Sequence, residues 1–211
     1  MIAMPRPTKI VCVGRNYVAH ARELGNEVPD RPLLFLKPPS ALVGPGEAIV
    51  RPPESSRIEH EGEIGVVIAR ACRHVAEADA LDYVAGYRAL NDVTARDLQK
   101  TDGQWSRAKG FDTFCPVGPV VPAAGIDPDR LEVSCSVDGE ERQRGTAGDM
   151  AFAIPYLVHY ISRIMTLEPG DIVATGTPEG VGPLPAGCEV EVEVALDGRP
   201  LSVVRSPVRD P

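Results

Sequence analysis

Two glutamates separated by a single residue, Glu61 and Glu63, are the strongest candidates for functional residues in the sequence. They open a β-branched run, and residues 61–69 are therefore predicted to form a buried β-strand. Alternate residues of a strand point to the same face, so the two carboxylates project together. In a buried strand such a pair must take up a proton or share a cation, because the two negative charges repel each other. Oxygen ligands favour a hard ion such as Mg²⁺, Mn²⁺ or Ca²⁺, although a solvated acidic sheet edge would carry the same pattern.

Asp92 is the candidate for a third carboxylate at this site. It follows the extended segment predicted at Val84–Asn91 and precedes a short helix predicted at Thr94–Lys100, for which Thr94 is the expected cap. Functional side chains gather at such junctions, but a plain turn or cap role for Asp92 is equally open. Gly62 lies on the face opposite the two glutamates and predicts a close approach of another backbone segment.

His20 and Glu23 form a second candidate pair. A short helix is predicted from about Tyr17 to Leu24, ended by Gly25. Residues three positions apart meet on one side of a helix, so the imidazole and the carboxylate can contact each other. A carboxylate that orients a histidine and stabilises its protonated form produces a good general base. The same spacing also occurs in ordinary surface ion pairs.

The segment Thr175–Pro183 offers hydroxyl groups and free backbone N–H groups after a predicted strand, which suits an anion such as a carboxylate. It has no lysine of the kind found in a phosphate-binding P-loop, so nucleotide binding is disfavoured, and a plain turn is the alternative. Lys109 on its own indicates nothing. Gly14-Arg15 lacks the glycine spacing of a dinucleotide fingerprint.

The elements that would position these residues are short strands separated by proline and glycine, with a few short helices. Two Asp-Gly pairs, at 138–139 and 197–198, predict hairpin turns. No stretch has the composition of a linker, so residues 1–211 are predicted to form one α+β, mostly β domain with its core at about 8–204. The other expected strands are Thr8–Val13, Leu33–Lys37, Leu131–Val137, Glu140–Arg144, Ile172–Thr175, Glu189–Ala195 and Leu201–Val204, and the other expected helices are Ala76–Asp82 and Ile154–Met165.

Composition limits the classes of partner. The chain has 211 residues, a formal net charge of −8 and an isoelectric point near 5.1, which argues against nucleic-acid binding because phosphate contacts need clustered Lys and Arg. Its longest apolar run is far shorter than the roughly 20 residues that cross a bilayer. No basic region followed by an apolar one opens the sequence, so secretion is not expected. The five cysteines form no CxxC motif and are expected to be buried, reduced thiols of a cytoplasmic protein.

Taken together, these segments resemble the fumarylacetoacetate hydrolase family, specifically its short single-domain members. The resemblance runs from about residue 8 to residue 204, and its specificity lies in the order of the motifs, since each alone is weak. The matching motifs are Val13–Tyr17 with His20, Pro32–Pro38, His60–Glu63 with Val66–Ile68, Gly86-Tyr87, Asn91–Gln99, Trp105 with Lys109, Phe111–Pro119, Leu167–Asp171 and Thr175–Gly182.

The resemblance implies a mixed β-sandwich roll, a homodimer, and a Mg²⁺ or Mn²⁺ ion held by three carboxylates. The ligands would be Glu61, Glu63 and Asp92. The catalytic residues would be His20 and Glu23, a water-activating dyad on a mobile lid, and Lys109, which would stabilise developing charge. The residues that bind substrate would be Arg15, Gln99 and Thr177. Gly62 and Asn91 depart from the residues that the family often has there, but neither removes a ligand.

The expected activity is hydrolysis of a carbon–carbon bond in acylpyruvates such as fumarylpyruvate or acetylpyruvate, which gives pyruvate and a carboxylic acid. The alternatives are a 2-hydroxyhepta-2,4-diene-1,7-dioate isomerase or an oxaloacetate decarboxylase built on the same site. A binding protein that only retains the fold is a third alternative. Both Mg²⁺ and Mn²⁺ fit the expected site, because both accept the same ligands.

Overall fold

A six-stranded mixed sheet forms the centre of the protein in the computed structural model, which describes residues 4–23, 25 and 27–211. Its strands lie in the order β10-β7-β6-β13-β1-β2. Their bounds are β1 Ile10–Gly14, β2 Leu33–Lys37, β6 Gly62–Ile68, β7 Val84–Asn91, β10 Val121–Pro122 and β13 Ile172–Ala174. Every residue of β6 is buried, which accounts for its continuous β-branched sequence, because both faces of this strand are covered.

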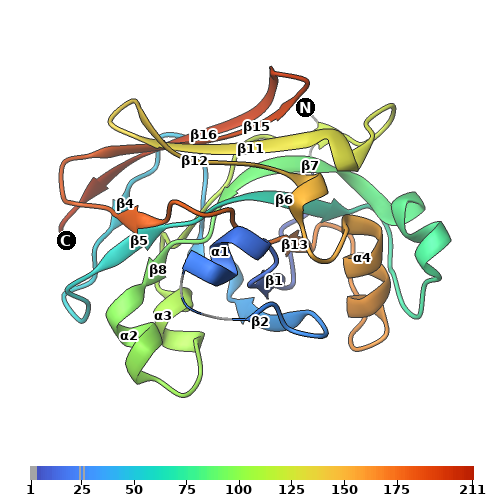
Figure 1. Cartoon of the computed structure of the whole chain (residues 1–211), viewed down its shortest axis with the longest axis horizontal. Helices are drawn as coiled ribbons and strands as arrows, with labels where there is room; N and C mark the ends of the chain where they lie inside the picture. Colours follow the sequence, from blue (N-terminus) through green and yellow to red (C-terminus); the bar gives the residue numbers. More distant parts are fainter. Residues whose placement is uncertain (1–3, 24, 26) are drawn as a thin grey trace.

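A five-stranded sheet packs over the first one, in the order β12-β11-β15-β16-β4. Its strands are β4 Ile49–Val50, β11 Leu131–Val137, β12 Glu140–Thr146, β15 Glu189–Leu196 and β16 Arg199–Arg209. In Figure 1 it crosses the top of the molecule above β6 and β7. Strand β11 alternates between buried and half-buried residues, as expected where one face of a sheet meets the core.

The two predicted hairpins are confirmed. Asp138 and Gly139 join β11 to β12 with φ angles of 52° and 78°, and Asp197 and Gly198 join β15 to β16 with φ angles of 50° and 72°. Two consecutive positive φ angles match the twist of antiparallel strands, and Asp-Gly tolerates them well.

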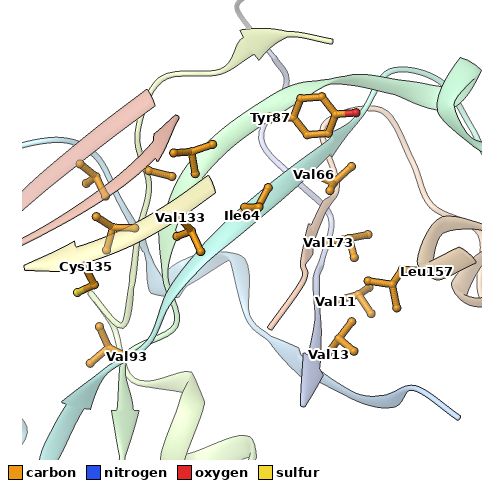
Figure 2. Close-up of a cluster of buried hydrophobic side chains, with 14 of the residues drawn as sticks. Val11, Val13, Ile64, Val66, Tyr87, Val93, Val133, Cys135, Leu157 and Val173 are labelled. Atoms are coloured by element: carbon orange, nitrogen blue, oxygen red, sulfur yellow. The ribbon is translucent and has the colours of Figure 1, made fainter. Parts of the chain in front are cut away.

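The main core lies between the two sheets and continues beneath helix α4. Figure 2 shows Ile64 of β6 facing Val133 and Cys135 of β11, while Val11 and Val173 point toward Leu157 of α4. All five cysteines are buried free thiols, as expected.

Smaller elements complete the fold. Two short sheets contain β3 Leu42–Val43 with β9 Cys115–Pro116, and β5 Ile58–His60 between β8 Thr94–Ala95 and β14 Gly182–Pro183. The α-helices are α1 Val18–Glu23, α2 Arg96–Thr101, α3 Ser106–Gly110 and α4 Ile154–Ser162. The 3₁₀ helices are Pro39–Ala41, Glu77–Tyr83, Pro128–Arg130 and Ala147–Asp149.

The mostly β fold with a few short helices is therefore confirmed, and several predicted boundaries are corrected. The helix predicted from Thr94 begins at Arg96, and Thr94 does not cap it: the Thr94 hydroxyl donates to the Asp92 carbonyl over 2.9 Å, and residues 94–95 form β8. The helix predicted at residues 76–82 is a 3₁₀ helix, α4 stops three residues early, and the last strand is longer than 201–204. Position 24, the predicted end of the first helix, lies outside the described residues. Within the part of the chain that the structure describes, no helix has the length and apolarity needed to span a membrane.

Candidate active site

Strand register brings the three predicted carboxylates together. Glu61 immediately precedes β6, Glu63 lies on it, and Asp92 follows the adjacent antiparallel strand β7. The pairing of Gly62 with Asn91 places Asp92 beside Glu61, and the Asp92 N–H donates to the Glu61 carbonyl over 2.8 Å. One carboxylate oxygen from each of the three residues lies within 4.8 Å of the other two, and all three are buried.

Cationic side chains neutralise two of these carboxylates. Lys109 Nζ lies 2.7 Å from Glu61 Oε2 and 2.7 Å from Asp92 Oδ2. Lys37 Nζ donates to Asp92 Oδ1 over 2.7 Å, and Arg96 Nη2 donates to Glu61 Oε1 over 2.6 Å. Burial acts to raise the pKa of Glu61, but the charges of Lys109 and Arg96 outweigh it and hold that pKa below its ordinary value.

Glu63 has no ion pair with any described residue. Its carboxylate accepts the Gly176 N–H over 2.9 Å. Burial, together with the charges of Asp92 and Glu61, raises the pKa of Glu63 well above its ordinary value. An oxygen-only donor set with an uncompensated carboxylate fits a hard divalent cation, whose charge would remove this repulsion. Glu61, Glu63 and Asp92 therefore suit the metal that the sequence predicts.

The predicted contact between His20 and Glu23 forms, and its histidine is buried while its glutamate is partly exposed. His20 on α1 is only 5% exposed, and its Nδ1 lies 3.1 Å from Glu23 Oε2. The other oxygen of Glu23 accepts the Gly180 N–H over 3.0 Å. Glu23 is thus fixed at both oxygens, and it orients a buried imidazole.

A pocket of about 80 Å³ collects nearly all of these groups. Its lining includes Arg15, His20, Glu61, Glu63, Asp92, Gln99, Lys109 and Thr177, and of the predicted site residues only Glu23 does not line it. Phe35 and Trp105 supply an apolar side, and their rings meet edge to face with centroids 5.3 Å apart.

The three predicted substrate-binding residues differ in how they are held. Arg15 is half-buried, forms no ion pair with the described residues, and has a left-handed φ of 58°. Gln99 accepts a hydrogen bond from Arg96 Nη1 over 2.5 Å. The Thr177 hydroxyl donates to the Gly62 carbonyl over 2.9 Å and accepts from Gln143 Nε2 over 2.7 Å.

The expectation of free hydroxyl and N–H groups along residues 175–183 is therefore partly wrong. The Thr175 and Thr177 hydroxyls donate to backbone carbonyls of β6, and the N–H groups of Gly176 and Gly180 donate to Glu63 and Glu23. The segment packs directly on β6, so most of its polar groups are used inside the protein.

Two buried cations of the site were not assigned a role from the sequence. Lys37 ends an apolar strand and its side chain is fully buried, and Arg96 bridges Glu59 and Glu61. A lysine that closes the run Leu33–Leu36 and precedes two prolines is a signal that could have found the first, since a buried lysine needs an anionic partner. Arg96 opens α2 four residues after Asp92, which is a weaker signal of contact with the site.

Comparisons with known proteins identify the family of the chain. The sequence model of the fumarylacetoacetate (FAA) hydrolase C-terminal domain matches residues 9–208, and the chain belongs to the fumarylacetoacetate hydrolase family. It is 49% identical over 210 residues to the mitochondrial oxaloacetate tautomerase FAHD1 of Arabidopsis thaliana, covering 92% of this chain and 94% of that protein. It is 47% identical to the protein of that name from Pongo abelii, over 88% of this chain and 86% of the relative. The X-ray structure of 5-carboxymethyl-2-hydroxymuconate delta-isomerase from Mycobacterium smegmatis superposes with a TM-score of 0.88 at 43% identity, over 98% of this chain and 80% of that one.

Proposed function

We propose that this enzyme binds Mg²⁺ or Mn²⁺ through Glu61, Glu63 and Asp92 and acts on short 2-oxo acids. The observation that carries the proposal is the meeting of three buried carboxylates at one pocket that also holds His20. A bound divalent cation would supply Lewis-acid stabilisation of the negative charge that develops on a substrate oxygen.

The chain's own residues would move the proton and hold the substrate. His20 would accept or return a proton at its Nε2, because Glu23 engages its Nδ1. Lys109, buried between two carboxylates, would place a fixed positive charge near the developing anion. Arg15 would bind a carboxylate of the substrate through its guanidinium. Gln99 and Thr177 line the pocket and would contact the bound substrate there.

The first candidate reaction is keto–enol tautomerisation of oxaloacetate. It moves one proton between C3 and the 2-oxygen, so it needs a base and charge stabilisation but no nucleophile. Two relatives near half identity carry the name oxaloacetate tautomerase, and this similarity favours oxaloacetate as the substrate.

The second candidate is the hydrolysis of an acylpyruvate, which the His20–Glu23 dyad favours. The imidazole would remove a proton from water, the hydroxide would add to the distal carbonyl, and the carbon–carbon bond would break to release a carboxylic acid and the enolate of pyruvate. Isomerisation of 2-hydroxyhepta-2,4-diene-1,7-dioate and decarboxylation of oxaloacetate need the same charge stabilisation, and both belong in the same assay.

One substrate panel separates these reactions. Oxaloacetate, acetylpyruvate, fumarylpyruvate and the seven-carbon dienedioate are assayed with Mn²⁺ or Mg²⁺ and again with a chelator. We expect the largest kcat/KM for oxaloacetate tautomerisation, abolished by the chelator. His20→Asn should lose turnover and keep Mn²⁺ affinity measured by calorimetry. Full activity with chelator, or no activity on any substrate, would refute the proposed function.

The resemblance also suggests a cytoplasmic homodimer, which we retain as a proposal. Light scattering of the purified protein tests the dimer, since a single species at the 22.6 kDa mass of one chain would contradict it.

A further inference from the structure

Gln143 lies in a strand whose sequence gives no sign of a functional site. Strand β12 reads EERQRGT, and its polar side chains are exposed except that of Gln143, which is 2% exposed. A buried side-chain amide is costly unless its hydrogen-bonding groups are paired. Its partners therefore indicate the role of this residue.

All of the partners of Gln143 lie beside the candidate active site. Oε1 accepts from the Gly62 N–H over 3.0 Å and from His60 Nδ1 over 2.9 Å. Nε2 donates to Thr177 Oγ1 and to the Pro178 carbonyl, each over 2.7 Å. The Gly62 N–H can only donate and the Pro178 carbonyl can only accept, so these two groups fix the orientation of the amide. It follows that His60 carries its proton on Nδ1.

Gly62 permits this contact between the two sheets. A Cβ atom at Gly62 would lie 2.9 Å from the Cβ of Cys135 on β11 and 3.6 Å from Oε1 of Gln143. The absence of a side chain lets the second sheet approach the backbone between Glu61 and Glu63. The Gln143 amide is thus held against the segment that supplies two of the three carboxylates.

The other end of the amide holds the segment that places Thr177 in the pocket wall. The Thr177 hydroxyl returns a hydrogen bond to the Gly62 carbonyl over 2.9 Å. The same segment carries the Gly176 N–H that binds Glu63 and the Gly180 N–H that binds Glu23. One buried amide therefore sets the distance between the carboxylate strand and the N–H groups that orient a ligand glutamate and the dyad glutamate.

We propose that Gln143 is a positioning residue for the metal site: it clamps Gly62 to Thr177-Pro178 and so holds Glu61 and Glu63 at the spacing that a divalent cation requires. The inference rests on the proposed function only in taking these carboxylates as metal ligands. Residues that orient the ligands of a metal without touching the metal contribute about 10–100-fold to its affinity.

Calorimetric titration of the full chain with Mn²⁺ tests the clamp. Gln143→Met keeps the length of the side chain and removes all four hydrogen bonds, and we expect the dissociation constant to rise about 10–100-fold. Gln143→Asn is one methylene shorter and keeps an amide, so it serves as the milder variant if Gln143→Met folds poorly. We expect it to raise the dissociation constant of Mn²⁺ by less than Gln143→Met does.

Ser202→Ala is the matched control. Ser202 is likewise buried, at 1% exposed, and bridges two segments, since its hydroxyl donates to the Pro119 carbonyl over 2.7 Å and accepts the Ala89 N–H over 3.0 Å. Its replacement removes a buried bridge between the sheets without touching Gly62 or the segment 175–183. Thermal unfolding should show a loss of stability in both proteins, whereas only the Gln143 variants should lose Mn²⁺ affinity.

A spectroscopic readout separates positioning from general destabilisation. Nitrogen-15 NMR of the wild-type imidazoles should place the His60 proton on Nδ1, and Gln143→Met should shift it toward Nε2. A wild-type His60 protonated on Nε2, or wild-type Mn²⁺ affinity in both folded Gln143 variants, would overturn the inference while leaving the proposed function intact. A wild-type protein that binds no Mn²⁺ would instead reject the proposed function, and the clamp with it.

Discussion

The three carboxylates of the site differ in how their charge is balanced, and the difference is set by single residues. Asp92 accepts from two lysines, one at each oxygen, and Glu61 accepts from Lys109 and Arg96. Glu63 accepts only a backbone N–H among the described residues. Buried ions paired in this way are tolerated inside a protein, whereas an unpaired carboxylate is not. Glu63 is therefore the ligand whose negative charge depends most on a bound cation.

Arg15 supplies the prediction that belongs to the residue scale. It lines the pocket without an ion pair to the described residues, and its left-handed backbone marks a conformation that a non-glycine residue adopts at a cost. Arg15→Gln should raise KM for oxaloacetate about 10–100-fold, the equivalent of losing a charged hydrogen bond of about 1.5–3 kcal/mol. The value of kcat should change little, because the contact is made equally in substrate and transition state.

The matched control for this variant is Arg22→Gln, which removes an exposed arginine of α1 outside the pocket. Steady-state kinetics of the two variants with oxaloacetate decide the point. An unchanged KM in Arg15→Gln, or an equal rise in Arg22→Gln, would show that Arg15 does not bind the substrate carboxylate.

At the scale of elements, strands bounded by strong local signals were predictable. The limits of β2 and β7 match the prediction, since proline ends the first and Asp92 ends the second. The Asp-Gly turns fixed the hairpins in the same way. The first turn of α2 was mispredicted because Thr94 pairs in β8 with β5, a contact between segments distant in the sequence.

The same reasoning separates the predicted and the missed parts of the site. Glu61 and Glu63 could be identified from their spacing in the sequence, because it predicts that both side chains point to one face of a strand. The roles of Lys37 and Gln143 arise from hydrogen bonds to residues 55 and 81 positions away. Lys37 carries a partial local signal in its place at the end of an apolar strand, whereas nothing in the sequence around Gln143, in the middle of β12, distinguishes a buried clamp from a solvated side chain. Tertiary contact alone decides between these two roles.

Asp171 supplies the prediction at the element scale, because it ties the chain before β1 to the turn before β13. Its side chain is fully buried and accepts the Thr8 N–H over 2.7 Å, the Glu168 N–H over 2.8 Å and Lys9 Nζ over 2.5 Å. Burial acts to raise the pKa of Asp171, but hydrogen bonds from Glu168, Lys9 and Thr8 outweigh it and lower that pKa. Asp171→Asn should destabilise the fold by about 2 kcal/mol at pH 7, since an amide N–H₂ would face these donors.

The sign of the pH dependence follows from the lowered pKa. The stabilisation by the Asp171 carboxylate is present above the pKa of an unfolded aspartate, about 3.9, and is lost as pH falls through the lower folded value. The stability difference between wild type and Asp171→Asn, measured by urea unfolding, should therefore shrink from pH 7 toward pH 3. Asp112→Asn, which alters an exposed aspartate with no ion pair to the described residues, is the control. A difference independent of pH would contradict the assignment.

At the scale of the whole molecule, the site is a junction of segments that are separate in the unfolded chain. Glu61 precedes β6, Glu63 lies near the start of that strand and Asp92 follows β7, and the fold alone brings an oxygen of each within 4.8 Å of the others. A cation that requires all three ligands binds the folded state and only weakly the unfolded chain. Binding must then stabilise the whole protein by mass action.

Mn²⁺ at 100 times its dissociation constant should therefore add about 2.7 kcal/mol to the stability of the fold. For a chain of 211 residues, that corresponds to a rise in Tm of roughly 5–10 °C, which calorimetric or fluorescence melting would detect and a chelator would reverse. Glu61→Gln removes one ligand and should abolish the rise, whereas Glu141→Gln, which alters an exposed carboxylate on β12, should keep it. A melting temperature that does not respond to Mn²⁺ in the wild type would mean that the three carboxylates meet without binding a metal. Lys37, Arg96 and Lys109 would then serve only to neutralise the carboxylates that face them.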